Sequence, residues 1–120
     1  MRIYWMIAAF VLLSACSSQS YSKNIDRNGQ ASWYGSHHHG KKTANGERFN
    51  QHELTAAHRT LPFGTKVKVT NARTKKSVIV RINDRGPYAK GRIIDLSRAA
   101  AQQINMVNSG VAPVQLQVIR

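Results

Sequence analysis

The sequence predicts a small, mainly β domain, a barrel of short strands with one or two short helices. Apolar and polar residues alternate over residues 65–70, as they do in a strand with one buried face. A second apolar segment, residues 77–82, follows the polar, turn-forming residues 71–76, so a hairpin is the simplest arrangement of the two. Residues 115–120 alternate in the same way and predict a closing strand.

One segment, residues 97–104, has the pattern of a helix. Ser97 is a suitable N-terminal cap, and three successive alanines at residues 99–101 favour helix. One face of this helix is apolar and consists of Leu96, Ala100 and Ile104. Several short strands with a single helix indicate a small barrel.

The N-terminus has the pattern of an export signal. A positive start, Met1-Arg2, precedes an apolar run at residues 3–13 that falls short of the roughly 20 residues that cross a bilayer. The run ends in Leu-Ser-Ala-Cys at residues 13–16. We therefore predict that residues 1–15 are a cleaved lipoprotein signal peptide and that Cys16 carries lipid. The alternative is an uncleaved N-terminal anchor, and both put the domain outside the cytoplasm.

Residues 16–28 are polar and predict a flexible tether, which leaves residues 29–120 as one compact domain. Cys16 is the only cysteine, so the domain contains no internal disulfide and depends on its core. Ser17 and Ser18 follow Cys16 without an aspartate, which resembles lipoproteins sent to the outer membrane. We expect a lipid-anchored protein of the cell envelope that faces the periplasm from the outer membrane.

A carboxylate lies where a predicted strand meets a sharp turn. Asp84 follows the apolar segment 77–82 and precedes Arg85-Gly86-Pro87, so we expect it to be rigid and reachable by solvent. Together with Glu47 and His58 it forms an acid/base set on separate segments. Structural alternatives remain: Asp84 as a carboxylate that caps turn amides, and His58 as a hydrogen-bonded core histidine.

Other residues allow both structural and functional interpretations. Asp95 precedes the predicted helix, where a carboxylate suits the helix N-terminus, so a structural role is favoured. Three histidines at residues 37–39 suggest a metal, but on an extended chain they point alternately outward, and we predict a solvated loop and no metal site. Tyr34 precedes Gly35 and is expected at a binding groove, with Trp33 inside.

Four blocks, in order along the chain, resemble the rare lipoprotein A family. They are ASWYG (31–35), KTANGERF (42–49), LTAAHRTLPFGT (54–65) and NDRGPYAKGRIIDLS (83–97). Members of this family are lytic-transglycosylase-like proteins of the bacterial envelope. The resemblance covers about residues 30–120 and implies a six-stranded double-psi β-barrel.

The resemblance also implies a function and a set of site residues. It implies an endolytic enzyme that cleaves the MurNAc-GlcNAc strand of peptidoglycan without water, because the muramyl 6-hydroxyl attacks its own anomeric carbon and leaves a 1,6-anhydro end. Glu47, His58 and Asp84 match the catalytic positions. Asp84 is expected to be the acid, Glu47 to stabilise the oxocarbenium-like charge, and His58 to orient Asp84 or hold a sugar hydroxyl. The expected substrate-binding residues are Tyr34, Arg59, Arg85, Tyr88 and Asp95. The alternative is a non-catalytic, expansin-like protein that binds peptidoglycan.

The charge of the chain fits such a partner. Lysine and arginine number 18 against five acidic residues, and they occur in pairs such as Lys41-Lys42 and Lys75-Lys76. No recognition helix or aromatic-basic RNA motif is present, so we do not expect nucleic acid as a partner. We expect peptidoglycan strands with acidic stem peptides, the anionic membrane surface, and division or envelope proteins as partners. We expect a monomer that needs no cofactor.

Overall fold

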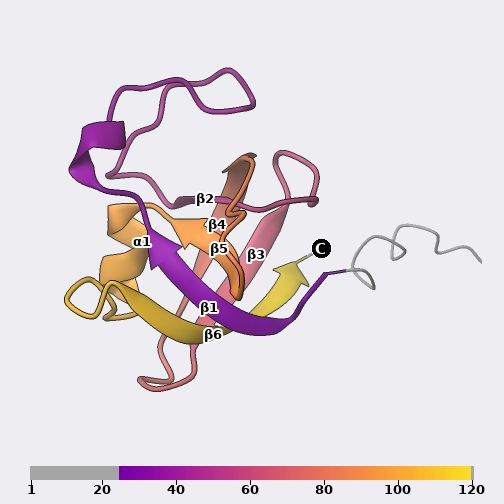
Figure 1. Cartoon of the computed structure of the whole chain (residues 1–120), viewed down its shortest axis with the longest axis vertical. Coiled ribbons are helices and arrows are strands. Elements are labelled where there is room, and N and C mark those ends of the chain that lie inside the picture. The colour runs from indigo at the N-terminus through magenta and orange to yellow at the C-terminus, as the bar shows by residue number, and fades with distance from the viewer. Residues whose placement is uncertain (1–24, 120) are drawn as a thin grey trace, which may run out of the picture.

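The structure, a computed structural model, describes residues 25–119. The predicted signal peptide, Cys16 and most of the predicted tether lie outside the described residues. Six strands, one α-helix and one short 3₁₀ helix make up the fold (Figure 1). In chain order they are β1 (Asn28–Trp33), η2 (Ser36–His38), β2 (Thr55–Ala57), β3 (Lys66–Asn71), β4 (Ser77–Asp84), β5 (Arg92–Leu96), α1 (Arg98–Gln103) and β6 (Val111–Ile119).

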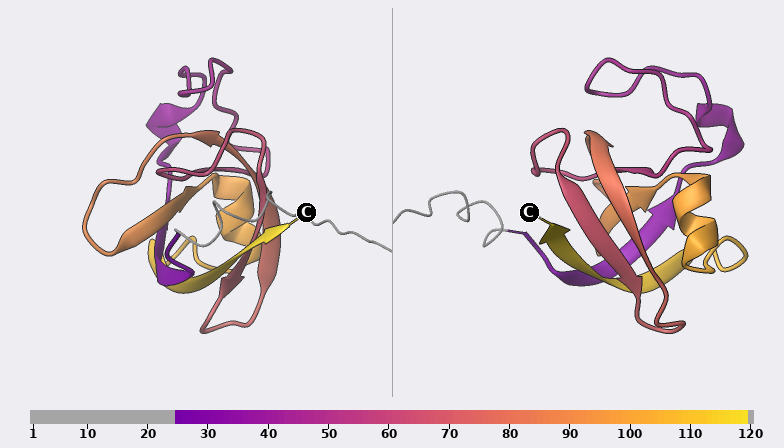
Figure 2. Two further views of the ribbon diagram at one scale, coloured as in Figure 1. Left: turned by 90° about the vertical axis from the view of Figure 1, so that its right-hand side faces the viewer. Right: turned by 180° about the vertical axis from the view of Figure 1, so that it is seen from behind.

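The six strands close into a barrel in the order β1-β5-β2-β4-β3-β6, with β6 returning to β1. Two neighbouring pairs, β1 with β5 and β2 with β4, are parallel, and the other four pairs are antiparallel. Because a parallel pair cannot be joined by a tight hairpin, each needs a connection that crosses an end of the barrel. Figure 2 shows these connections from two further sides. The predicted six-stranded β-barrel is confirmed.

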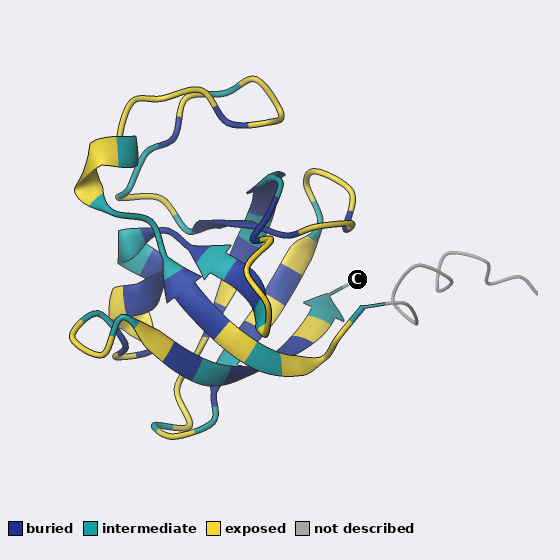
Figure 3. Cartoon of the chain, viewed as in Figure 1, coloured by how far each residue is buried: buried dark blue, intermediate teal, exposed yellow. Residues whose placement is uncertain are grey.

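Alternation along β3 and β4 places one side of each strand in the barrel core. Val67 and Val69 of β3 are fully buried, while Lys66 and Lys68 are exposed. The hairpin predicted for these two strands forms in register, with Val67 opposite Val80. Figure 3 shows the buried positions as alternating bands along the strands. The core therefore consists of the inward rows of the strands, and the cations lie outside it.

The predicted helix forms with its expected cap. The Ser97 hydroxyl accepts a hydrogen bond from the Ala100 amide at 3.2 Å, and Leu96, Ala100 and Ile104 are fully buried. The helix ends at Gln103, one residue before the predicted end, and Ile104 is its C-cap. Asn105 follows with a positive φ of 62°, which ends the helical backbone.

A long excursion leads from the end of β1 to β2 and rises over one end of the barrel (Figure 1). It contains η2 and the isolated bridge between Lys42 and Arg48. Phe49, only 3% exposed, stacks on the ring of Tyr34, which directly follows β1. The excursion therefore brings residues 43–47 to the end of β4, where Asn45 donates its backbone N–H to the Asn83 carbonyl at 3.2 Å.

The barrel begins earlier than the predicted domain boundary. β1 starts at Asn28, Ile25 packs against the core, and the Arg27 carbonyl accepts the Leu116 amide at 2.8 Å. The last residues of the predicted tether thus belong to the barrel, because β6 supplies partners for their backbone. None of the helices within residues 25–119 has the length and hydropathy required to cross a membrane.

Two isoleucines of β4 allow a matched test of the core. Ile82 is fully buried, whereas Ile79 is 49% exposed. Ile82→Ala should lower the free energy of unfolding by about 2–5 kcal/mol, because it removes buried methyl groups and leaves a cavity. The same change at Ile79 should cost about 0.5 kcal/mol or less. Urea denaturation measures both, and equal losses would contradict the assignment of the inward row.

Candidate functional site

A groove of about 550 Å³ lies at the end of the barrel where β1 and β4 finish. Its walls come from four segments: the end of β1, the helix η2, the turn after β4, and β5. The residues that line it are Ser32, Trp33, Tyr34, Gly35, His37, His38, Asp84, Arg85, Gly86, Pro87, Tyr88, Arg92 and Asp95. Four of the predicted substrate-binding residues and one predicted catalytic residue are therefore brought together.

Asp84 is the last residue of β4, and neutral hydrogen-bond donors hold its carboxylate at this groove. Its Oδ1 accepts the Ala44 amide at 2.8 Å and the Arg85 amide at 2.9 Å, and its Oδ2 accepts the Tyr34 hydroxyl at 2.6 Å. The turn-capping alternative thus describes part of its environment. The Oδ2 atom lies beside a hydroxyl, which is able to donate or accept a hydrogen bond.

Tyr34 takes part in the groove with both its hydroxyl and its aromatic ring. The ring stacks on Phe49 at 4.6 Å with an interplanar angle of 30°, and lies 5.1 Å from the His38 ring. Burial, together with the hydrogen bond to Asp84 and its nearby charge, raises the pKa of the Tyr34 hydroxyl well above its usual value. The hydroxyl therefore stays protonated and remains a donor to Asp84 at neutral pH.

Asp95 faces the groove and takes no part in capping the helix. Its carboxylate accepts the Ser32 hydroxyl, and Arg92 lies 4.0 Å from it. Ser97 caps α1, whose first turn contains no acidic residue. The sequence favoured a structural role for Asp95 at the helix N-terminus. In the structure Asp95 instead pairs with Ser32, because β1 lies parallel to β5 and places the two residues opposite each other.

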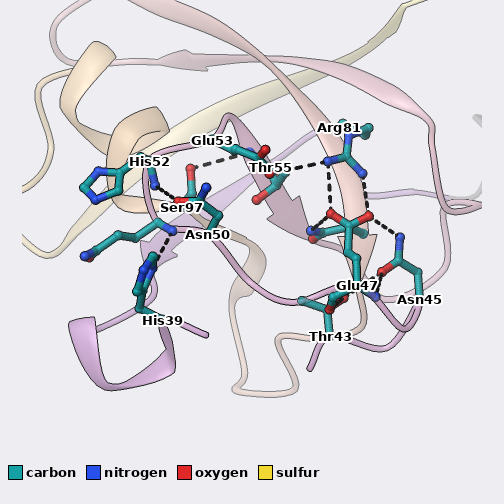
Figure 4. A network of polar contacts seen from close by, with 12 residues as sticks. His39, Thr43, Asn45, Glu47, Asn50, His52, Glu53, Thr55, Arg81 and Ser97 are labelled. Atoms are coloured by element: carbon teal, nitrogen blue, oxygen red, sulfur yellow. Dashed lines mark hydrogen bonds and ion pairs between the residues drawn. The ribbon is translucent and has the colours of Figure 1, made fainter. Parts of the chain in front are cut away.

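Glu47 lies outside the groove lining, on the outer face of the barrel near β4 (Figure 4). Arg81 contacts both of its oxygens, Nη1 to Oε2 at 2.8 Å and Nη2 to Oε1 at 3.0 Å. Asn45 donates to Oε2 at 2.7 Å and Asn83 to Oε1 at 3.2 Å. The hydrogen bonds from Arg81 and Asn45 lower the pKa of Glu47 to about 2, so this carboxyl is ionised at neutral pH.

His58 follows β2 and is only 5% exposed. Its Nδ1 accepts the backbone amides of Thr60 and Leu61, each at 3.1 Å. Burial, with Arg59 and Arg85 nearby, lowers the pKa of His58 to about 4, so the ring is neutral at pH 7. An accepting Nδ1 places the proton of the neutral ring on Nε2. The environment matches the alternative of a hydrogen-bonded core histidine.

The remaining predicted contacts divide between the groove and the surface. Arg85 lines the groove, donates Nη1 to the His58 carbonyl at 3.3 Å, and lies 4.0 Å from the centre of the Phe63 ring. Tyr88 also lines it and is 75% exposed, so its ring is available to a ligand. Arg59 is outside the groove lining and lies 3.7 Å from Asp26.

Sequence reasoning missed Ser32, Arg81 and Arg92 in this region, and it placed Trp33 inside the domain, whereas Trp33 is only partly buried against the core and lines the groove. Ser32 and Arg92 line the groove, and Arg81 holds Glu47. Ser32 lies within the first matched block, which was the available signal. For Arg81 the signal was its place two residues before Asn83 on the same face of the strand. Its partner, Glu47, is 34 positions away, so no local pattern indicates the contact.

The histidines at residues 37–39 do not lie on an extended chain, contrary to the prediction. His37 and His38 belong to the 3₁₀ helix η2, and their rings lie 4.1 Å apart. His39 accepts the Gln51 amide on Nδ1 at 3.2 Å and packs its edge against the His52 ring. Within residues 25–119 no three His, Cys, Asp or Glu side chains are arranged to hold a metal ion.

Known structures share this fold. A Streptomyces papain inhibitor superposes with a TM-score of 0.62 at 21% identity, covering 81% of this chain and 98% of the inhibitor. The expansin of Clavibacter michiganensis superposes with a TM-score of 0.61 at 19% identity, covering 78% of this chain and 50% of the expansin. At such low identity these likenesses concern the fold alone.

Sequence comparison identifies closer relatives. The Probable endolytic peptidoglycan transglycosylase RlpA of Synechocystis is 63% identical over 94 residues, which are 78% of this chain and 29% of that protein. The Endolytic peptidoglycan transglycosylase RlpA of Campylobacter jejuni is 62% identical over 91 residues, 76% of this chain and 33% of that protein. The chain thus spans about a third of these relatives. A family model described as Lytic transglycolase matches residues 26–116, and the chain belongs to this RlpA-like family of double-psi β-barrel proteins.

Proposed function

We propose that this chain is an endolytic peptidoglycan lytic transglycosylase that cleaves the MurNAc-GlcNAc strand and leaves 1,6-anhydromuramyl ends. Relatives named as endolytic or probable endolytic peptidoglycan transglycosylases are 53–63% identical to it over 76–81% of its length. The observation that carries the proposal is the Asp84 carboxyl, held by three donors at a groove that also contains Asp95 and an exposed tyrosine, Tyr88.

The proposed reaction needs one group that first gives and then takes a proton. Protonated Asp84 transfers its proton to the glycosidic oxygen as the bond from that oxygen to the muramyl anomeric carbon breaks. The 6-hydroxyl of the same muramyl residue attacks the anomeric carbon, and its proton passes to the Asp84 carboxylate. The acid is regenerated, and no water is consumed.

The contacts of Asp84 support Oδ2 as the oxygen that carries the transferred proton. Two backbone amides donate to Oδ1, and an amide N–H cannot accept a hydrogen bond from this oxygen if it becomes protonated. The partner of Oδ2 is the Tyr34 hydroxyl, which donates to the carboxylate and is able to accept from the carboxylic acid. Proton transfer at Oδ2 therefore needs no rearrangement of the backbone.

Glu47 and His58, which the resemblance places in the catalytic set, lie outside the groove lining. The proposal consequently gives the proton transfers to Asp84. The substrate contacts are proposed for the groove residues Tyr34, Arg85, Tyr88, Arg92 and Asp95, where Tyr88 offers an exposed ring to a sugar.

We also propose a location for the protein in the cell. The charged start, the apolar run and the sequence Leu-Ser-Ala-Cys at residues 13–16 support lipidation of Cys16 and an outer-membrane location facing the periplasm. Lipid on Cys16 would keep the groove near the peptidoglycan layer.

The products of digestion test the proposed reaction. Purified protein incubated with sacculi, without added metal, should release soluble fragments that end in 1,6-anhydromuramic acid, lighter by one water than hydrolytic products. Mass spectrometry identifies them. Reducing-end muramic acid would indicate a hydrolase. Binding to intact and peptide-stripped glycan with no release, by a folded sample, would favour the expansin-like alternative.

Asp84→Asn tests the acid. The amide has nearly the same shape but no proton to give, so turnover should fall by about 10²–10⁴-fold while circular dichroism stays unchanged. Asp26→Asn makes the same chemical change at a carboxylate whose side chain is 72% exposed and outside the groove, and it should leave turnover unchanged. Comparable turnover by a folded Asp84→Asn protein would exclude Asp84 as the acid.

Cys16→Ala tests the anchor. Without the thiol no lipid is attached, so the protein should leave the membrane fraction or be retained as an unprocessed precursor. Fractionation followed by mass determination of the N-terminus distinguishes these products. A wild-type protein that keeps an intact Met1 in the membrane fraction would support the uncleaved anchor instead.

A further inference from the structure

We infer that Arg81 is a positioning residue for Asp84, and that the ion pair of Arg81 with Glu47 holds residues 43–47, here termed the Glu47 loop, against the end of β4. The inference rests on the proposed function and assigns to Glu47 a role at a distance from the substrate. Neither Arg81 nor Glu47 lines the groove.

The Glu47 loop is closed by its own hydrogen bonds. The Thr43 amide donates to the Glu47 carbonyl at 2.8 Å, and the Gly46 amide donates to the Thr43 carbonyl at 3.0 Å. Gly46 has a φ of +96°, a conformation that other residues rarely adopt. The Asn45 side-chain oxygen accepts the Glu47 amide at 3.1 Å. These contacts make the loop one stiff unit, so a restraint at Glu47 also restrains Ala44.

The loop is attached to β4 at three successive points. Arg81 and Asn83 hold the Glu47 carboxylate, the Asn83 carbonyl accepts the Asn45 amide at 3.2 Å, and Asp84 accepts the Ala44 amide at 2.8 Å. The third attachment is one of the three hydrogen bonds that orient the proposed acid. The ion pair and the acid are therefore connected by a short, continuous segment of the chain.

The Glu47 carboxylate has no free capacity for a substrate. Four contacts, two from Arg81 and one each from Asn45 and Asn83, are divided equally between Oε1 and Oε2. A carboxylate oxygen offers about two acceptor sites, so both oxygens are filled. A Glu47 that takes or gives a proton would have to break this arrangement.

The ion pair between Arg81 and Glu47 is expected to affect the position of the Glu47 loop more than the stability of the whole domain. Side-chain exposure is 37% for Arg81 and 33% for Glu47, and solvent screening makes such pairs weak contributors to global stability. Its two parallel hydrogen bonds instead fix the relative orientation of strand and loop. We therefore expect the removal of Arg81 to misplace Asp84 without unfolding the barrel.

Kinetics of four variants test the inference. Arg81→Gln should lower kcat by about 10–100-fold, because small errors in the position of a reacting group are costly, while KM changes by less than about threefold. Arg81→Lys keeps the charge but loses the bidentate geometry, and should fall between wild type and Arg81→Gln. Glu47→Gln and the double variant Glu47→Gln/Arg81→Gln should each match Arg81→Gln, because the two side chains act as one unit.

Lys66→Gln is the matched control. Lys66 lies opposite Arg81 on the neighbouring strand, is exposed, and forms no ion pair with any described acidic residue. It should keep the kcat of wild type. Additive losses in the double variant, or a kcat for Arg81→Gln equal to that of wild type, would overturn the inference.

A measurement without substrate separates this inference from the proposed function. Hydrogen exchange at the Ala44 and Asn45 amides should accelerate in Arg81→Gln, while exchange in the core strands stays as in wild type. If the wild-type protein has no activity but exchange at these two amides accelerates in Arg81→Gln, the proposed function fails, and the inference that the ion pair holds the Glu47 loop stands. If the two amides keep their protection in Arg81→Gln, that inference is wrong whatever the activity.

Discussion

The pairing of β4 with β2 on one side and β3 on the other is the constraint on which the site depends. Val78, Val80 and Ile82 point into the core and fix the register of β4 against both neighbours. Register determines which residues emerge at the end of the strand, since a shift by one residue would exchange the inner and outer faces. The burial of this apolar row turns Arg81 to the outer side of β4, and Asp84 ends the strand after a register shift between β2 and β4.

The carboxylates of this basic protein are held in two different ways. Within residues 25–119, Asp26, Glu47, Glu53 and Asp95 each lie within 4.0 Å of an arginine nitrogen. Asp84 has no such ion pair among the described residues and is held by two amides and a hydroxyl. The four ion-paired carboxylates are thus restrained by charged side chains, whereas the donors to Asp84 come from the backbone and from the Tyr34 hydroxyl.

The fold itself is shared with proteins of other kinds, including an expansin and a papain inhibitor. A fold that hosts several functions leaves the activity to the side chains placed on it. In this chain the distinguishing side chains lie at one end of the barrel, where the turn after β4 meets the end of β1. The hydrogen bond between Tyr34 and Asp84 lies at this end of the molecule.

Local patterns in the sequence predicted three of the six strands and the helix, and its matched blocks indicated the family. The β3–β4 hairpin and the cap at Ser97 follow from alternation and capping, which act within a few residues, and the matched blocks brought Asp84 to attention. Only the tertiary structure decided the partners: Ser32 with Asp95, Tyr34 with Asp84, and Glu47 with Arg81. These residues are separated by 63, 50 and 34 positions, and no local pattern encodes contacts made by barrel closure. For the same reason, the matched blocks did not show that Glu47 and His58 lie outside the groove lining.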